Sequence, residues 1–231
     1  MNGIDVSTFG NASTVAKARS EFIRNTYLNL AIAFVVFIAF EALLLSWQPA
    51  VELAARMVNG GNWLIVLLAF MGVSWIANKW ALSGASLGKQ YAGLYLYVIA
   101  EAIIFMPLLL VASQIAPDTI PQAAIMTGAL TAGIMIYAFI SKKNFSFLGS
   151  FLTILSFVAL GLIVCAVLFG LNLGTWFSAA MIVFASLAVL YQTSAMIHQY
   201  RNDQYVAAAL GLFAAIALLF WYILQILMSR R

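Results

Sequence analysis

Acidic side chains inside long apolar runs are the residues of this chain best placed for chemistry in a membrane. Glu101 lies near the middle of one run, and Pro107 follows it six residues later. Ionisable groups inside lipid cost about 2.5–3.5 kcal/mol each on insertion scales, so they are rare and usually functional. Because proline removes a helical hydrogen bond and kinks a helix, this pair predicts a cation or proton site at Glu101. A glutamate that only holds helices together is the alternative.

Weaker candidates lie near the ends of other runs. Glu41 is about five residues from the end of its run, so its carboxyl is expected to reach the interface. Lys79, Ser194 and His198 are predicted to form a polar cluster on the cytoplasmic side. His198 is the only histidine and could sense pH, with a passive interfacial histidine as the alternative. Lys79 has a long apolar stem that lets its charge reach the interface.

The sequence contains no recognisable arrangement for an enzyme or a cofactor. One histidine, one cysteine (Cys165) and two distant glutamates do not form a metal-ligand pattern. There is neither a nucleophile elbow nor a phosphate-binding loop. We therefore predict a protein that is not an enzyme and carries no cofactor. Its basic residues lie in short joints and indicate topology, so no nucleic acid partner is expected.

The elements that position these residues are seven apolar runs, each long enough to cross a bilayer. A spanning helix needs about 20 apolar residues, and 65% of the 231 residues are hydrophobic while 8% are charged. The runs do not alternate as barrel strands do, whereas helices satisfy every backbone group internally. The predicted fold class is therefore an all-α integral membrane protein. Between a cytoplasmic segment 1–24 and an external tail 229–231, the domain 25–228 holds spans at 25–46, 62–82, 91–112, 119–140, 146–170, 174–198 and 205–228.

Basic residues near the ends of the spans predict the orientation of the bundle. With the N-terminus inside, eight of them lie on the inner side and three on the outer side. They are Lys17, Arg19, Arg24, Lys79, Lys89, Lys142, Lys143 and Arg201 inside, and Arg56, Arg230 and Arg231 outside. A cytoplasmic N-terminus, an external C-terminus and a bacterial inner membrane are predicted. The external joint 47–61 is the longest, and 51–58 within it is predicted as a short interfacial helix.

Small residues indicate which helices are internal, because they let helices approach closely. The fourth span has Ala124, Gly128 and Ala132 at four-residue spacing. The last span carries small residues through most of its first half, and we expect both helices to have neighbours on several sides. The second half of the last span is bulky, with Leu218 and Trp221, and is expected to widen the bundle toward the outside.

Four stretches, in order along nearly the whole chain, resemble the Bax inhibitor-1 family, and most closely its bacterial YccA-like branch. They are the Phe-Ile-Arg-Asn-Thr-Tyr of residues 22–27, the Ser-Lys-Lys-Asn-Phe-Ser-Phe-Leu-Gly of 141–149, the Leu-Tyr-Gln-Thr-Ser-Ala-Met-Ile-His of 190–198, and the final run 205–227. The resemblance implies six helices around a central seventh.

The resemblance also implies two activities. Some family members resemble a pH-sensitive calcium leak gated by two acidic residues on the sixth and seventh helices. At those positions this chain has Gln192 and Ala215. Two neighbouring carboxylates can share a proton and switch with pH, which glutamine and alanine cannot do. The YccA-like branch is linked to restraint of a membrane-anchored, ATP-dependent AAA protease.

Three functions remain as alternatives. The first is a stress-protective module that binds and restrains the AAA protease, with the polar N-terminal segment as the candidate contact. The second is a calcium, cation or proton leak in which Glu101 replaces the missing acid pair. The third is a structural membrane protein whose buried polar groups serve only packing. The expected partners are the bilayer, the protease, and calcium or protons.

Overall fold

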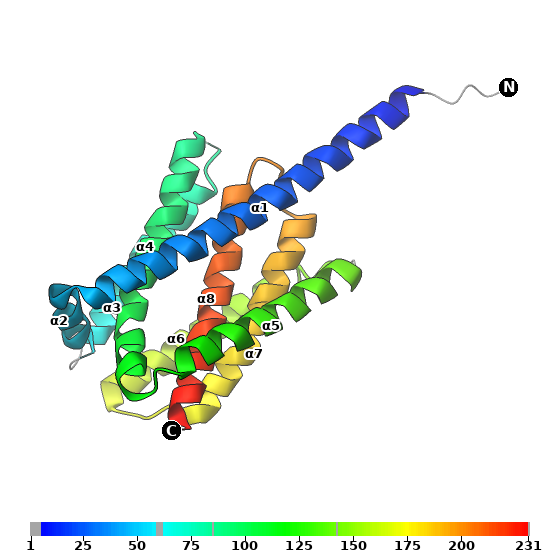
Figure 1. The fold of residues 1–231 in the computed structure, drawn as a ribbon. Helices are drawn as coiled ribbons and strands as arrows, with labels where there is room; N and C mark the ends of the chain where they lie inside the picture. The colour runs from blue at the N-terminus through cyan, green and yellow to red at the C-terminus, as the bar shows by residue number, and fades with distance from the viewer. Residues whose placement is uncertain (1–5, 59–61, 85, 142, 231) are drawn as a thin grey trace.

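The computed structural model describes residues 6–58, 62–84, 86–141 and 143–230, with side chains described from residue 14 onward. Within these residues the chain forms eight helices and no strand (Figure 1). Seven of them, all except α2, are long and apolar enough to cross a membrane, which confirms the all-α seven-span fold class. The helices are α1 (Val6–Ser46), α2 (Gln48–Met57), α3 (Asn62–Ala81), α4 (Leu87–Ile115), α5 (Thr119–Ser141), α6 (Leu148–Phe169), α7 (Gly174–His198) and α8 (Tyr205–Ser229).

Local sequence rules explain two of the helix boundaries. Helix α2 has Pro49 in its first turn, where the missing N–H of proline is not needed for a helical hydrogen bond. Helix α6 ends at Gly170, whose φ of 66° lies in the left-handed region that glycine adopts without strain. The short helix predicted at 51–58 is α2, which begins a few residues earlier than expected.

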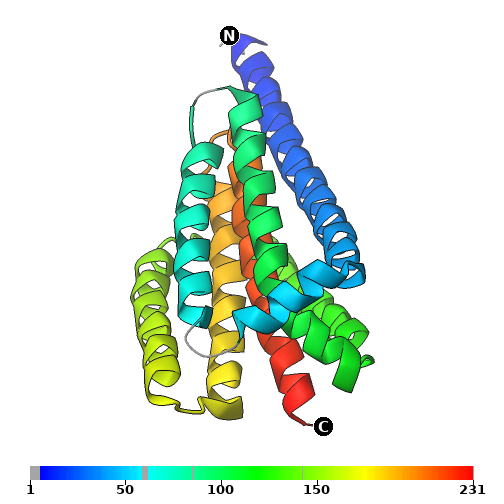
Figure 2. The same cartoon turned by 90° about the vertical axis from the view of Figure 1, so that its left-hand side faces the viewer.

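Helix α8 lies at the centre of the bundle (Figures 1 and 2). It packs against α1, α3, α4, α5 and α7, and 72% of its most apolar stretch is buried. Its first half carries Ala207, Ala208 and Ala209, each at most 4% exposed. These small side chains let several helices approach at once, as predicted for the last span. Helix α6 packs against α7 and α3.

The prediction that the small residues of α5 face other helices is wrong. Ala124, Gly128 and Ala132 are all exposed, and a Cβ added at Gly128 would meet nothing within 4 Å. The opposite face of α5 is the buried one. It consists of Thr119, Ala123, Thr127, Thr131 and Ala138. Small residues at this spacing permit a close contact between helices. On α5, Ala124, Gly128 and Ala132 make no such contact with another helix among the described residues.

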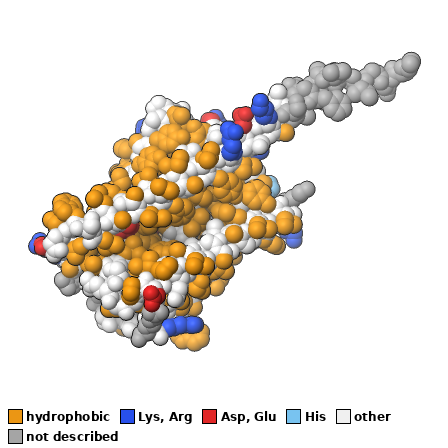
Figure 3. Space-filling model, viewed as in Figure 1, with side chains coloured by type: hydrophobic (Ala, Val, Ile, Leu, Met, Phe, Trp, Pro, Cys, Tyr) orange, Lys and Arg blue, Asp and Glu red, His pale blue; other side chains and the backbone are white. Residues whose placement is uncertain are grey.

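The outer surface of the bundle suits contact with lipid. Figure 3 shows hydrophobic side chains over most of one face, with charged side chains mainly near its margins. Large apolar residues on α1 and α5 contribute to this surface, including Val35, Ile38, Ile125 and Ile136, each at least 58% exposed. A soluble domain rarely exposes such large continuous apolar patches. The chain is therefore an integral membrane protein in contact with the bilayer.

Candidate ligand and ion site

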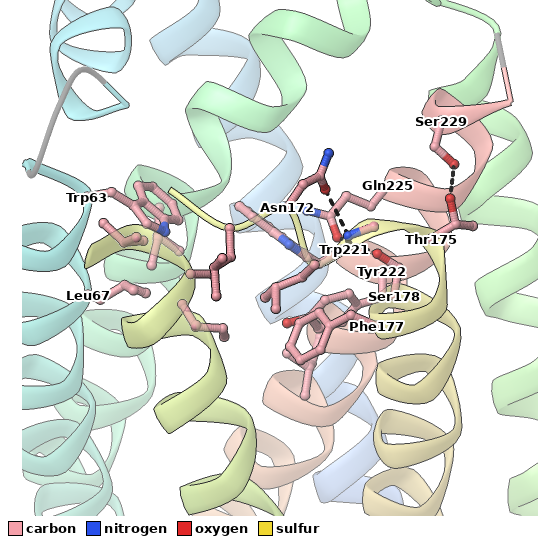
Figure 4. A pocket seen from close by; sticks show the side chains of 18 of the residues that line it. Trp63, Leu67, Asn172, Thr175, Phe177, Ser178, Trp221, Tyr222, Gln225 and Ser229 are labelled. Atoms are coloured by element: carbon pink, nitrogen blue, oxygen red, sulfur yellow. Dashed lines mark hydrogen bonds between the residues drawn. The ribbon is translucent and has the colours of Figure 1, made fainter. Parts of the chain in front are cut away.

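A cavity of about 820 Å³ lies between five helices, at the end of the bundle where α8 terminates (Figure 4). We call this end the C-terminal end. The cavity is lined by the start of α3, the middle of α4, the last turns of α6, the start of α7 and the second half of α8. Its volume falls within the range of about 300–1,000 Å³ that is usual for small-molecule sites.

Glu101 of α4 is one of the residues that line this cavity. Its side chain is 5% exposed, and its Oε2 atom is buried without a hydrogen-bond partner among the described residues. The Tyr97 hydroxyl, one helical turn away, interacts with the same carboxyl. Because buried polar groups are almost always hydrogen-bonded, an unpaired oxygen at a cavity marks Glu101 as a candidate binding group.

Aromatic rings form much of the cavity wall. Trp63 of α3 stacks with Trp221 of α8 at a centroid distance of 6.3 Å. The Trp221 ring also meets Phe105 edge to face at 4.9 Å, and Phe177 of α7 meets Tyr222 of α8 at 6.0 Å. Leu218 and Trp221, two of the residues that were expected to widen the bundle, line this cavity. The sequence offered no motif for the remaining rings, because they come from four separate helices.

Polar contacts at the rim hold α7 to α8. The Ser178 hydroxyl donates a hydrogen bond of 3.0 Å to Oε1 of Gln225, and the Thr175 hydroxyl lies 3.5 Å from that of Ser229 (Figure 4). At the start of α7, Asn172 accepts a hydrogen bond of 2.9 Å from the backbone N–H of Gly174. The rim groups therefore largely satisfy one another, and Glu101 keeps the unpaired oxygen.

Glu41 lies on α1 and does not reach out of the bundle as expected. Its side chain is only 4% exposed, and neither carboxyl oxygen has a hydrogen-bond partner among the described residues. Helix α1 packs against α2, α4 and α8, and this packing covers the side chain. Glu41 is not among the residues that line the 820 Å³ cavity. The structure therefore leaves Glu101 as the candidate acid of that cavity.

The substituted acid positions lie at the contact of α7 with α8. A Cβ added at Gly211 would lie 2.6 Å from Oε1 of Gln192, so the glutamine side chain covers this glycine. Ala215, one turn further along α8, is 5% exposed. Gln192 also lines a smaller cavity of about 460 Å³ between α6 and α7, together with several hydroxyl side chains. Neither position carries a charge.

The predicted polar cluster is divided between two helices. Ser194 of α7 accepts a hydrogen bond of 2.9 Å from the backbone N–H of Phe145, and so fixes the joint before α6. His198 donates through Nδ1 to the Ser194 carbonyl, 3.0 Å away. Lys79 lies on α3, where its Nζ is 5.0 Å from the centre of the Trp75 ring. Among the described residues no contact joins Lys79 to Ser194 or His198, so these three residues share no site.

Arg19 has a role that sequence reasoning missed, because it was counted only as a charge that sets topology. Its Nη1 donates to the Tyr200 carbonyl at 2.8 Å and to Oδ1 of Asn202 at 3.0 Å. Its Nη2 donates to the carbonyls of Ile197, at 2.8 Å, and Met196. A cation at the carbonyl end of a helix is favourable. We call this set of contacts the Arg19 clasp, which joins α1 to the end of α7.

Comparisons with known proteins agree with this architecture. The profile of a family described as "Inhibitor of apoptosis-promoting Bax1" matches residues 19–231. An uncharacterized protein of Pseudomonas aeruginosa is 30% identical over 224 residues, which cover 93% of this chain and 92% of the relative. A Golgi anti-apoptotic protein of vaccinia virus (strain Lister) is 26% identical over 95% of this chain and 91% of its own length. An uncharacterized membrane protein of Vibrio cholerae is 25% identical over 217 residues, which cover 90% of this chain and 89% of the relative.

Proposed function

Since this chain belongs to the Bax inhibitor-1 family, the resemblance of its four sequence stretches is confirmed, and we propose that it is a slow proton leak through the membrane. In this proposal Glu101, which lines the 820 Å³ cavity, takes up and releases the proton. The observation that carries it is the buried, unpaired carboxyl oxygen of Glu101 at that cavity.

Polar side chains on the buried face of α4 form the proposed path of the proton beyond the cavity. Gln90, Tyr97 and Glu101 all lie on this face, and each side chain is at most 8% exposed. The Oε1 atom of Gln90 is buried and unpaired, like Oε2 of Glu101. Gln90 and Tyr97 are seven residues apart, or about 10 Å along a helix, so the route requires bridging water molecules between them. These polar groups lead from the cavity toward the opposite end of the bundle.

The packing around this route favours protons over calcium. Leu94 and Val98 of α4 and Phe213 of α8 are completely buried beside it. Calcium requires six to eight oxygen ligands at about 2.3–2.6 Å, which a route with one carboxylate does not provide. A proton needs only a chain of exchangeable hydrogen bonds. The missing acid pair at Gln192 and Ala215 is also no obstacle, since the route does not use these positions.

We place the cavity on the external side of a bacterial inner membrane, with the N-terminus in the cytoplasm and residues 25–228 as the membrane domain. The distribution of basic residues supports this orientation. Relatives from Pseudomonas aeruginosa and Vibrio cholerae support a bacterial membrane. In this placement protons enter the cavity from outside and leave toward the cytoplasm.

The test of the leak is proton flux into proteoliposomes that contain the purified chain and a trapped pH-sensitive dye. A potassium diffusion potential drives the flux, and wild-type protein is expected to acidify the lumen. Glu101→Gln keeps the shape but removes the exchangeable carboxyl, so flux is expected to fall about tenfold or more, within the usual effect of a positioned proton-transfer group. Glu52→Gln, at an exposed position of α2, is the matched control and should retain the flux.

Three results would contradict this function. Equal proton flux in wild-type and Glu101→Gln protein would remove the carboxyl from the route. Calcium flux of similar size, measured in the same vesicles with a calcium dye, would mean that the route is wider than its packing implies. A folded chain that passes neither ion would leave the leak without support.

A second function, restraint of a membrane-anchored AAA protease, is favoured by one observation. Helix α1 begins at Val6 and reaches beyond the other helices at its N-terminal end (Figure 1). Val15 on this extension is 67% exposed, and Lys17 is also exposed. An exposed helix of this kind can dock in a groove of a partner. The anti-apoptotic name of the vaccinia relative fits a stress-protective role.

Removing residues 1–17 tests this contact, because it takes away Val15 and Lys17 and leaves the Arg19 clasp in place. Co-purification of the AAA protease with the truncated chain is expected to drop at least about fivefold from the full-length level, since the docking helix loses its free end. The control is the Arg24→Ala variant, which keeps the extension and removes one exposed charge further along α1. Undiminished co-purification of the truncated chain would show that the protease does not bind there.

A further inference from the structure

The chemistry of the 820 Å³ cavity selects for one class of ligand. Among the described residues that line it, Glu101 is the only one that can carry a full charge, and no basic side chain lines it. An ionised carboxylate in such a place is costly unless a cation pairs with it. Glu101 lines the cavity, and its Oε2 atom has no hydrogen-bond partner among the described residues, so this carboxyl is the group that would pair with the cation.

The wall of the cavity suits a cation with an apolar body. It contains the aromatic rings of Trp63, Phe70, Phe105, Phe177, Trp221 and Tyr222. Aromatic faces attract cations, and more strongly when the site is desolvated. The same rings bury the apolar surface of a ligand, which also favours binding. One carboxylate within an aromatic wall therefore recognises both parts of such a molecule.

A small inorganic cation is a poorer match for this site. Its hydration shell would have to be replaced by several oxygen ligands. Beyond Glu101, the polar side chains of Ser178 and Gln225 already bond to each other, as do the hydroxyls of Thr175 and Ser229. A large organic cation spreads its charge, is weakly hydrated and needs no such replacement. The size of the cavity also exceeds the need of a single metal ion.

We propose that this cavity is a binding site for a lipophilic monovalent organic cation, with Glu101 as its counter-ion and the Trp63–Trp221 pair as part of its aromatic wall. The site rests on the proposed function in that both use the Glu101 carboxyl. A bound cation would occupy the position where the proton is exchanged, so it would also block the leak.

The test is equilibrium dialysis of radiolabelled tetraphenylphosphonium against the purified full-length chain in detergent. Saturable binding of one cation per chain is expected. Glu101→Gln should weaken this binding about tenfold or more, because a close charge pair contributes about 1.5 kcal/mol or more. Glu52→Gln should bind as the wild type does. Triphenylphosphine oxide, a neutral molecule of related shape, should bind far more weakly than the cation.

A second variant guards against a folding defect in Glu101→Gln. Trp63→Leu keeps the carboxyl and removes one aromatic face, so binding should weaken about two- to fivefold. Size-exclusion profiles identify any variant that has not folded. Equal binding in wild-type and folded Glu101→Gln protein, or equal binding of the neutral analogue, would mean partition into apolar surfaces and would overturn the site.

Proton flux measured on the same preparations separates the two proposals. If proton flux depends on Glu101 but tetraphenylphosphonium does not bind, the ligand site is overturned and the proposed proton leak is supported. Glu101-dependent binding without proton flux overturns the leak and supports the ligand site. Flux that tetraphenylphosphonium inhibits in the wild type supports both, because the cation and the proton then compete for one carboxyl.

Discussion

Gly93→Ala is expected to lower the free energy of unfolding by about 2 kcal/mol, since filling a tight contact typically costs about 1–3 kcal/mol. A Cβ added at Gly93 would lie 2.5 Å from the carbonyl oxygen of Ala77 and 2.7 Å from the amide nitrogen of Ala81. Both atoms belong to the backbone of α3, so no side chain can move aside. Helices α3 and α4 would have to separate, and both line the 820 Å³ cavity.

The control for Gly93→Ala is a glycine on the partner helix with free space around it. A Cβ added at Gly72 of α3 would meet nothing within 4 Å. Alanine favours the helix over glycine by up to about 1 kcal/mol, so Gly72→Ala should be neutral or stabilising. Thermal unfolding in detergent should place the midpoint of Gly93→Ala about 4–8 °C below that of the wild type. Equal midpoints for the two variants would mean that α3 and α4 are not in tight contact.

Arg19→Ala is expected to destabilise the joint between α7 and α8 by about 2 kcal/mol. Hydrogen bonds to a charged group contribute about 1.5–3 kcal/mol each, and partial exposure of Arg19 reduces the sum of its bonds. The variant loses the donors to the carbonyls of Met196, Ile197 and Tyr200. Limited proteolysis at residues 199–204 should then become faster, because the end of α7 is no longer tied to α1.

Two further substitutions separate the geometry of the Arg19 clasp from its charge. Arg24→Ala removes the same charge from the same helix at an exposed position, and its proteolysis rate should stay near that of the wild type. Arg19→Lys keeps the charge but not the planar fork that reaches several acceptors, so an intermediate rate is expected. If Arg19→Ala were cut no faster than Arg24→Ala, the clasp would contribute nothing to the stability of the joint.

Composition and run length were sufficient to predict the features set by the solvent. Seven long apolar helices follow from the need of each span to satisfy its own backbone in lipid. The central place of α8 follows from small residues such as Ala208 and Ala209, which leave room for five neighbouring helices. Glu101 was identifiable because a carboxyl in the middle of an apolar run is costly and therefore rare.

Other features depend on contacts between distant parts of the chain, which a single sequence does not encode as a pattern. The Arg19 clasp joins residues about 180 positions apart. In the sequence, Arg19 does not differ from any other basic residue near the end of a helix. The exposed residues Ala124 and Gly128 are a second example. Their spacing shows that a close helix contact is possible on this face of α5, but the sequence does not show whether another helix makes that contact. The cavity is likewise assembled from five helices.

The central position of α8 also has a consequence for synthesis of the protein. Helix α8 follows every other helix in the chain, yet α1, α3, α4, α5 and α7 all pack around it. While the ribosome is still translating, the six earlier spans must therefore remain side by side in the membrane without the helix that fills their centre. In a nascent chain stalled before Tyr205, the side chain of Gln192 would lack Gly211, the residue of α8 that it covers. Final assembly of the bundle thus depends on a helix that leaves the translocation machinery after the helices that pack around it.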